Sequence, residues 1–268
     1  DSSADVTGPV IPIMAHPPER TSDLSFRSFL ELATHHDERG RRRRRKHLKL
    51  DIKEEECIRT VLDELRRMPT TGEGSAPAGD ESGNAPFIFF NADILPGPGS
   101  RKGPGNVSAG ELIGPCMEYM ALEDGRGRAT CAFSLGWRTD PRSLLGYTKE
   151  DAGAMERTIR DYDLADTGVV LAVNARVLSK SLRALDGLMA AFPSCQVLVW
   201  TATGEPPISA ALRRKIWNHF DAVGCGERVG FDCNVAPNAV TGLLLDVAVA
   251  IVGVSWTVKN MFCNPHQQ

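Results

Sequence analysis

Short apolar runs recur along the chain, separated by segments in which apolar residues follow a helical spacing. Runs that have the length of a buried strand cover residues 10–15, 47–52, 87–90, 130–135, 169–173, 197–200 and 229–233. Helices are predicted over residues 23–34, with Ser22 as the capping residue, and over residues 54–68, 180–192 and 207–220. Strands that alternate with helices are typical of parallel βαβ units. The pattern predicts an α/β fold with at least seven parallel strands around one axis, in which the run at Pro12 is next to the run 47–52.

Seven strands are one short of the eight that close a TIM-type barrel. Either the sheet is open or a further strand precedes Asp1, and the short lead before the first run favours the further strand. We therefore predict a (β/α)8 barrel domain over residues 1–238 that lacks its first βα unit. Residues 239–268 are predicted to form the last barrel helix and a tail. The apolar stretch 239–258 is also long enough to span a membrane, but Asp246 near its middle would be unfavourable in lipid.

Three insertions are predicted within the barrel domain, at residues 38–46, 70–85 and 96–106. The first contains the basic run GRRRRRK, which is typical either of a patch for nucleic acid, acidic lipid or nuclear import, or of a solvated loop. The net charge of −3 favours the solvated loop, and we expect no nucleic-acid partner. The second insertion has the composition of a disordered loop, and the third is rich in glycine and proline without a phosphate-binding motif.

Cysteine usage bears on the compartment in which the protein works. The seven cysteines are scattered, none forms a CxxC pair, and most lie in apolar runs, as is typical of reduced, buried thiols. This pattern favours a reducing compartment. Asn106-Val107-Ser108 would be a glycosylation acceptor if the protein were secreted. The sequence leaves both locations open.

Polar residues gather where the predicted strands end. His16, Asp51, Lys53, Asn91, Asp93, Ser134, Trp137, Asn174, Arg176, Trp200, Thr201, Asp232 and Asn234 all occupy such positions. Active sites of parallel barrels lie at this end of the strands. A histidine and carboxylates that converge there could hold a divalent cation and act on a phosphate ester. Taken singly, each residue could instead be a helix cap or a hydrogen-bonded structural group.

Several short segments, in this order, resemble the menorin family. They are PIMAHPP (12–18) followed by SD (22–23), LKLDIK (48–53), NADIL (91–95) with GP (97–98), SLGW (134–137) and VGFD (229–232). That family is similar in fold to glycerophosphodiester phosphodiesterases and phospholipase-C-like enzymes, which use two histidines and a cluster of acids around a divalent cation. The resemblance implies secretion or membrane association, with a cytoplasmic location as the alternative.

The resemblance assigns roles to individual residues. His16 matches the second histidine, Asp51 matches a metal-binding acid, and Asp5 matches the second member of an acidic pair. Ser3 stands where the first acid of that pair is expected. The first histidine would precede Asp1, so the resemblance implies an incomplete set of proton-transfer groups.

Two functional interpretations follow. In the first, the protein is a metal-dependent phosphoric diester hydrolase that uses Mg²⁺ or Ca²⁺. The metal ligands would be Asp5, Asp51 and Asp93, the catalytic residues His16 and Lys53, and the substrate-binding residues Asn91, Arg176 and Trp200. In the second, the barrel is non-catalytic and binds a phosphodiester or phospholipid-derived ligand, or a cell-surface protein. Ser3 favours the second interpretation, and we expect little or no phosphodiesterase activity with weak cation binding.

Overall fold

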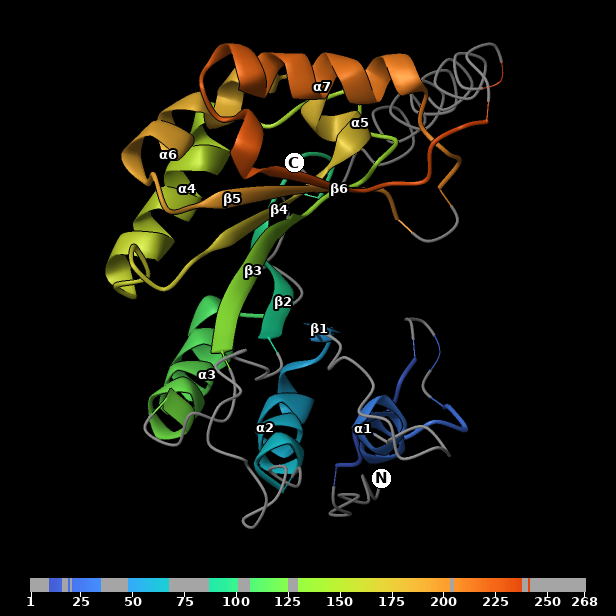
Figure 1. Ribbon diagram of the computed structural model, residues 1–268, viewed down its shortest axis with the longest axis vertical. Coiled ribbons are helices and arrows are strands. Elements are labelled where there is room, and N and C mark those ends of the chain that lie inside the picture. The colour runs from blue at the N-terminus through green and yellow to red at the C-terminus, as the bar shows by residue number, and fades with distance from the viewer. Residues whose placement is uncertain are drawn as a thin grey trace, which may run out of the picture. The chain divides into compact units, whose positions relative to one another are not determined.

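The computed structural model describes residues 10–15, 19, 21–34, 48–67, 87–100, 107–124, 130–202, 205–237 and 241 (Figure 1). Several predicted features fall outside these residues: Asp5, His16, the basic run, residues 70–85, Asn106 and, apart from Thr241, the apolar stretch 239–258. Within the described part, no helix has both the length and the apolar character needed to cross a bilayer.

An α/β fold is confirmed. The described residues contain a six-stranded parallel sheet whose spatial order follows the chain. The strands are β1 (Leu48–Asp51), β2 (Phe87–Pro96), β3 (Thr130–Arg138), β4 (Val170–Asn174), β5 (Gln196–Trp200) and β6 (Val229–Asp232). The helices of at least six residues are α1 (Phe26–Thr34), α2 (Ile58–Arg67), α3 (Ala109–Asp124), α4 (Lys149–Asp161), α6 (Asp186–Ala191) and α7 (Ala210–Ala222). Short helical turns are α5 (Ala175–Leu178), η1 (Glu55–Cys57), η2 (Leu182–Leu185) and η3 (Gly226–Arg228).

The predicted first strand is wrong. Residues 10–15 form no strand of the sheet, and Ile13 makes a single antiparallel bridge to Ser25. The run is not buried, since Ile11 is 68% exposed, and Pro12 has no N–H to donate to a ladder. Among the described strands β1 is an edge strand whose neighbour is β2, so the expected pairing with the run at Pro12 is also wrong.

The four predicted helices are confirmed with shifted bounds. α1 begins at Phe26, and its cap is Ser25, whose hydroxyl accepts a hydrogen bond from the Ser28 N–H at 3.1 Å. The Ser22 hydroxyl instead accepts from Leu24 N–H and donates to the Met14 carbonyl. The pattern missed α3, which contains Pro115, and α4, which begins with a capping box at Thr148.

The chain divides into two compact units, with the boundaries inside β2 and near the start of α3 and β3. The first unit comprises residues 1–90 and 110–131. Its α2 buries the apolar positions that the helical spacing predicted, among them Ile58, Leu62 and Leu65. Arg27 of α1 donates two hydrogen bonds, of 2.6 and 2.7 Å, to the carboxylate of Glu64 in α2. Phe90 and Tyr119 meet edge to face, with ring centroids 5.9 Å apart.

The second unit comprises residues 91–109 and 132–268. In Figure 1, α4, α6 and α7 lie on one side of β4, β5 and β6. Alternate strand residues are almost completely buried, including Phe133, Leu135, Leu171, Val173, Val197 and Val199. They form the apolar face that packs against helices, so the intervening residues must point to the opposite face.

The described cysteines are free thiols, and Cys116, Cys131, Cys195 and Cys225 are buried, as the sequence predicted. Burial raises the pKa of Cys195 to about 11 and that of Cys233 to about 12. Both thiols are therefore protonated at neutral pH.

Candidate functional site

The face of the sheet that points away from the helices carries polar and small residues together with the apolar Val170 and Leu198. In the parallel register Gly136 pairs with Ala172, Asn174 with Trp200, and Trp200 with Asp232. Paired residues of adjacent strands project to the same side of the sheet. On this basis we define the polar face as Asn91, Asp93, Ser134, Gly136, Ala172, Asn174, Trp200 and Asp232. All of these residues belong to the second unit.

Two contacts join β2 to β3 on the polar face. The Ser134 hydroxyl donates a 2.6 Å hydrogen bond to the side-chain oxygen of Asn91, and both side chains are buried. One step further along each strand, a Cβ atom at Gly136 would lie 2.7 Å from Oδ1 of Asp93. Glycine therefore leaves the room that the Asp93 carboxylate occupies. Asp93 itself is only partly buried.

Tyr147, in the loop before α4, contacts the end of β4 at Asn174. Its hydroxyl oxygen accepts a 3.0 Å hydrogen bond from the backbone N–H of Asn174, and its ring lies 5.3 Å from that of Trp137. Burial raises the pKa of Tyr147, and the negative charge of Asp93 raises it further. The phenol is therefore neutral at physiological pH and can donate its proton in a hydrogen bond.

Asn174 ends β4 and connects it to the next two loops. Its side-chain oxygen accepts hydrogen bonds from the N–H groups of Arg176 and Val177, at 3.0 and 3.2 Å, and thereby begins α5. Its amide group donates a 2.9 Å hydrogen bond to Oε2 of Glu205. Asn174 is completely buried, so these bonds satisfy a side chain that water does not reach.

Glu205 and Arg176 form a buried ion pair beside Asn174. Their closest charged atoms are 3.8 Å apart, and the side chains are only 9% and 5% exposed. Arg176 also donates to the carbonyl of Pro207 at 3.2 Å, while Glu205 accepts from the N–H of Ala202. The pair holds the loop after β5 against the end of β4.

Lys180 adds a second positive charge near this cluster. Burial lowers the pKa of Lys180, and the charge of Arg176 lowers it further. Its ammonium group donates to the carbonyl of Ser143. Lys180 is thus tied to the loop after β3, while Arg176 is paired with Glu205.

The predicted site residues fall into three groups. Asn91, Asp93, Arg176 and Trp200 all lie at or near the polar face of the second unit. Asp51 and Lys53 lie in the first unit, where they form a 2.9 Å ion pair at the end of β1. Asp5 and His16 lie outside the described residues. That His16, Asp51 and Asp93 open into one cavity stays a prediction.

A divalent cation would need more oxygen ligands than Asp93 alone supplies. In the described ranges, no cluster of three or more histidine, cysteine, aspartate or glutamate side chains could hold a metal ion. Asp93 suits the role chemically, because the residue is only partly buried and Gly136 leaves space beside it. The roles of Asp5 and Asp51 as further ligands stay predictions.

Sequence reasoning missed Tyr147 and Glu205. Glu205 lies five residues beyond the end of β5, and its proximity to a strand end is a signal that a search extended into the loop could have used. Tyr147 lies in the loop between β3 and α4, and nothing in its sequence surroundings indicates that its hydroxyl meets β4. Both residues reach the site through loop conformation.

A comparison with known families agrees with the pattern of segments. Residues 2–224 match the family model described as the Menorin N-terminal domain. The match covers most of the 268 residues and all of the polar face except Asp232.

Proposed function

The chain belongs to the menorin family, and from this premise we propose that it binds a phosphodiester or phospholipid-derived ligand, together with Mg²⁺ or Ca²⁺, at the polar face of its sheet. The observation that carries the proposal is the position of Asp93. Asp93 is only partly buried, and its carboxylate lies beside Gly136 on a face that carries the polar residues Asn91, Ser134, Asn174 and Asp232 among apolar neighbours. A sheet face that served only as core would carry apolar side chains there.

We further propose that the sheet belongs to a TIM-type (β/α)8 barrel of the phospholipase-C-like kind. The support is topological. Strands β3 to β6 are parallel and adjacent in chain order, and helices lie between them in the sequence. Repeated βα units of this kind close into barrels, whose ligands bind at the carboxyl ends of the strands. Asn174 and Trp200 are the last residues of β4 and β5, and Asp93 lies three residues before the end of β2.

In this proposal each candidate site residue has a defined role. Asp93 would provide an oxygen ligand for a cation that offsets the negative charge of the phosphate, and the family resemblance implies Asp51 and Asp5 as further ligands. Lys53 and Arg176 add positive charge for the phosphate, while Asn91 and Trp200 contact the rest of the ligand. By the family resemblance, His16 would give a proton to a leaving alcohol oxygen.

Hydrolysis would require a further group. Water must lose a proton as it attacks phosphorus, while the bond from phosphorus to the leaving oxygen breaks and that oxygen gains a proton. Of the histidines, the described ranges contain only His219, which lies on α7 and pairs with Asp186 at 2.8 Å. Ser3 stands where the family resemblance implies the first acid of the metal-binding pair, and on this ground we propose that binding prevails over turnover in this chain.

Calorimetric titration with Mg²⁺ and Ca²⁺ tests the proposal. Asp93→Asn should weaken cation binding by about tenfold or more, because it removes a full negative charge from the ligand set. Asp166→Asn is the matched control, since Asp166 is an exposed carboxylate in the loop after α4. Equal affinities of wild type and Asp93→Asn would contradict the proposal.

Hydrolysis of glycerophosphodiesters, with Mg²⁺ or Ca²⁺ present, tests the balance between binding and turnover. We expect little or no product from the purified chain. Robust turnover that disappears in His16→Ala and in Asp51→Ala would instead identify the protein as a hydrolase.

A further inference from the structure

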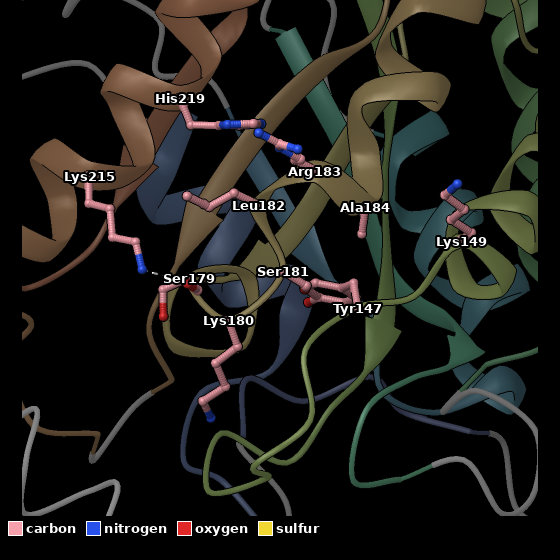
Figure 2. A pocket seen from close by; sticks show the side chains of 10 residues that line it. All are labelled: Tyr147, Lys149, Ser179, Lys180, Ser181, Leu182, Arg183, Ala184, Lys215 and His219. Atoms are coloured by element: carbon pink, nitrogen blue, oxygen red, sulfur yellow. Dashed lines mark hydrogen bonds between the residues drawn. The ribbon is translucent and has the colours of Figure 1, made fainter.

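A second site lies in the helical layer of the second unit, on the side of the sheet opposite the polar face. A pocket of about 540 Å³ is bounded by the start of α4, the segment 179–184 and the middle of α7 (Figure 2). Its volume falls in the range of roughly 300–1,000 Å³ that is usual for small-molecule sites. Its walls come from one compact unit, so its shape is defined by that unit alone.

The lining of this pocket is strongly basic. Lys149, Lys180, Arg183, Lys215 and His219 all line it, and none of the lining residues described is a carboxylate. Asp186 contacts the pocket only indirectly, through its 2.8 Å hydrogen bond with His219. Five basic residues therefore line one pocket in a protein whose net charge is −3.

Elsewhere on the second unit, some basic side chains lie against carboxylates, while Arg228 donates to backbone carbonyls such as those of Phe192 and Met189. Arg142 pairs with Asp140 at 3.1 Å, and Arg160 pairs with Glu156 at 2.7 Å. In the pocket, two of the ammonium groups are held by neutral carbonyls. Lys215 donates to the carbonyl of Ser179 at 3.0 Å, and Lys180 donates to that of Ser143. These bonds fix the positions of the lysines without cancelling their charge.

Concentrated positive charge of this kind attracts anions and is stabilised by them. Desolvation is the main cause that lowers the pKa of Lys180, and the nearby positive charge of Arg176 lowers it further. Asp140 and Glu205 act on Lys180 in the opposite direction, but neither lines the pocket. The lining thus leaves a place for negative charge that the described protein groups do not supply.

We propose that this pocket binds a small molecule that carries at least two phosphate groups. A single phosphate could not neutralise four lysine and arginine side chains. The planar guanidinium of Arg183 suits bidentate contact with phosphate oxygens, and the lysines act as point charges around it. Leu182 and the ring of Tyr147 provide an apolar wall for the part of the ligand that is not phosphate.

Calorimetric titration with inorganic diphosphate tests this proposal. The double variant Arg183→Gln with Lys215→Gln should bind diphosphate about tenfold or more weakly, because two charge-assisted contacts are lost. The matched control is Arg157→Gln with Arg214→Gln, which removes two exposed positive charges from α4 and α7 without touching the pocket lining. The control should keep the wild-type affinity within about twofold, since exposed charges at a distance are screened by salt.

Further measurements identify the source of the phosphate and distinguish this pocket from the proposed cation site at Asp93. Binding to vesicles that contain phosphatidylinositol bisphosphate, lost in the same double variant, would show that a lipid headgroup supplies the same chemistry. Asp93→Asn should leave diphosphate binding unchanged, so failure of the cation site does not affect this test. Arg183→Lys keeps the charge but should still weaken binding, because the bidentate contact is lost. No diphosphate binding by wild type, or equal losses in the double variant and its control, would overturn the proposal.

Discussion

Gly136 in β3 lies against Asp93 in β2 so closely that no larger residue fits between them. A Cβ atom at position 136 would be 2.7 Å from Oδ1 of Asp93 and 3.1 Å from the carbonyl oxygen of Ala172. The carbonyl belongs to the sheet and cannot move freely, so the Asp93 side chain would have to leave its position. The sequence of β3 thus determines where the candidate ligand carboxylate points.

Gly136→Ala should therefore destabilise the protein and disturb the polar face together. We expect a loss of about 1–3 kcal/mol in the free energy of unfolding, the usual range for an overpacked interior site. Urea denaturation measures the loss, and cation titration measures the effect on Asp93. Gly187→Ala is the control, because a Cβ there meets no atom within 4 Å and Gly187 lies in α6. A variant as stable as wild type would show that β3 can shift away from β2.

The loss of folding stability at low pH should depend on Glu64. Its hydrogen bonds with Arg27 lower the pKa of Glu64 below its ordinary value of 4.5, and the charges of Arg27 and Arg67 lower it further. Because the folded-state pKa is depressed, the stabilisation is present above the unfolded-state pKa. It is lost as the pH falls through the folded-state pKa. The contribution should therefore be complete at neutral pH, begin to fall as the pH drops below the ordinary value of 4.5, and be lost once the pH is below the lowered folded-state pKa.

Thermal unfolding followed between pH 7 and pH 3 checks this expectation. Glu64→Gln should lower the melting temperature at pH 7 and make it less dependent on pH in the acid range. Glu56→Gln, at an exposed position of η1, should leave the profile close to that of wild type. Parallel profiles for wild type and Glu64→Gln would show that the Arg27 contact adds no stability.

The sequence predicted strands correctly where an apolar run is covered on both faces of the sheet. Leu171 and Val173 in β4 and Val197 and Val199 in β5 are almost fully buried, and their runs were correctly identified as strands. The run at Ile11 is also apolar but is exposed, and Pro12 has no N–H to donate to a neighbouring strand. Composition alone cannot separate these cases, because burial depends on whether another layer covers the run.

The same reasoning explains which site residues were found. Asn91, Asp93 and Trp200 lie in strands, so their positions follow from strand register. Tyr147 and Glu205 lie in loops, and their contacts with Asn174 span 27 and 31 residues of sequence. Loop conformations of this kind depend on tertiary contacts that no local pattern encodes.

Among the carboxylates near Asn174, Glu205 should be the one whose substitution lowers stability most. Glu205→Gln would leave the positive charge of Arg176 buried beside a neutral amide, since both side chains are under 10% exposed. Removing one partner of a buried ion pair typically lowers the free energy of unfolding by about 3–5 kcal/mol. The matched control is Glu156→Gln, which breaks the exposed pair with Arg160 and should change stability by less than about 1 kcal/mol. Urea denaturation of both variants measures the difference. Equal, small effects would mean that the hydrogen bond to the carbonyl of Pro207 is enough to hold Arg176 in place.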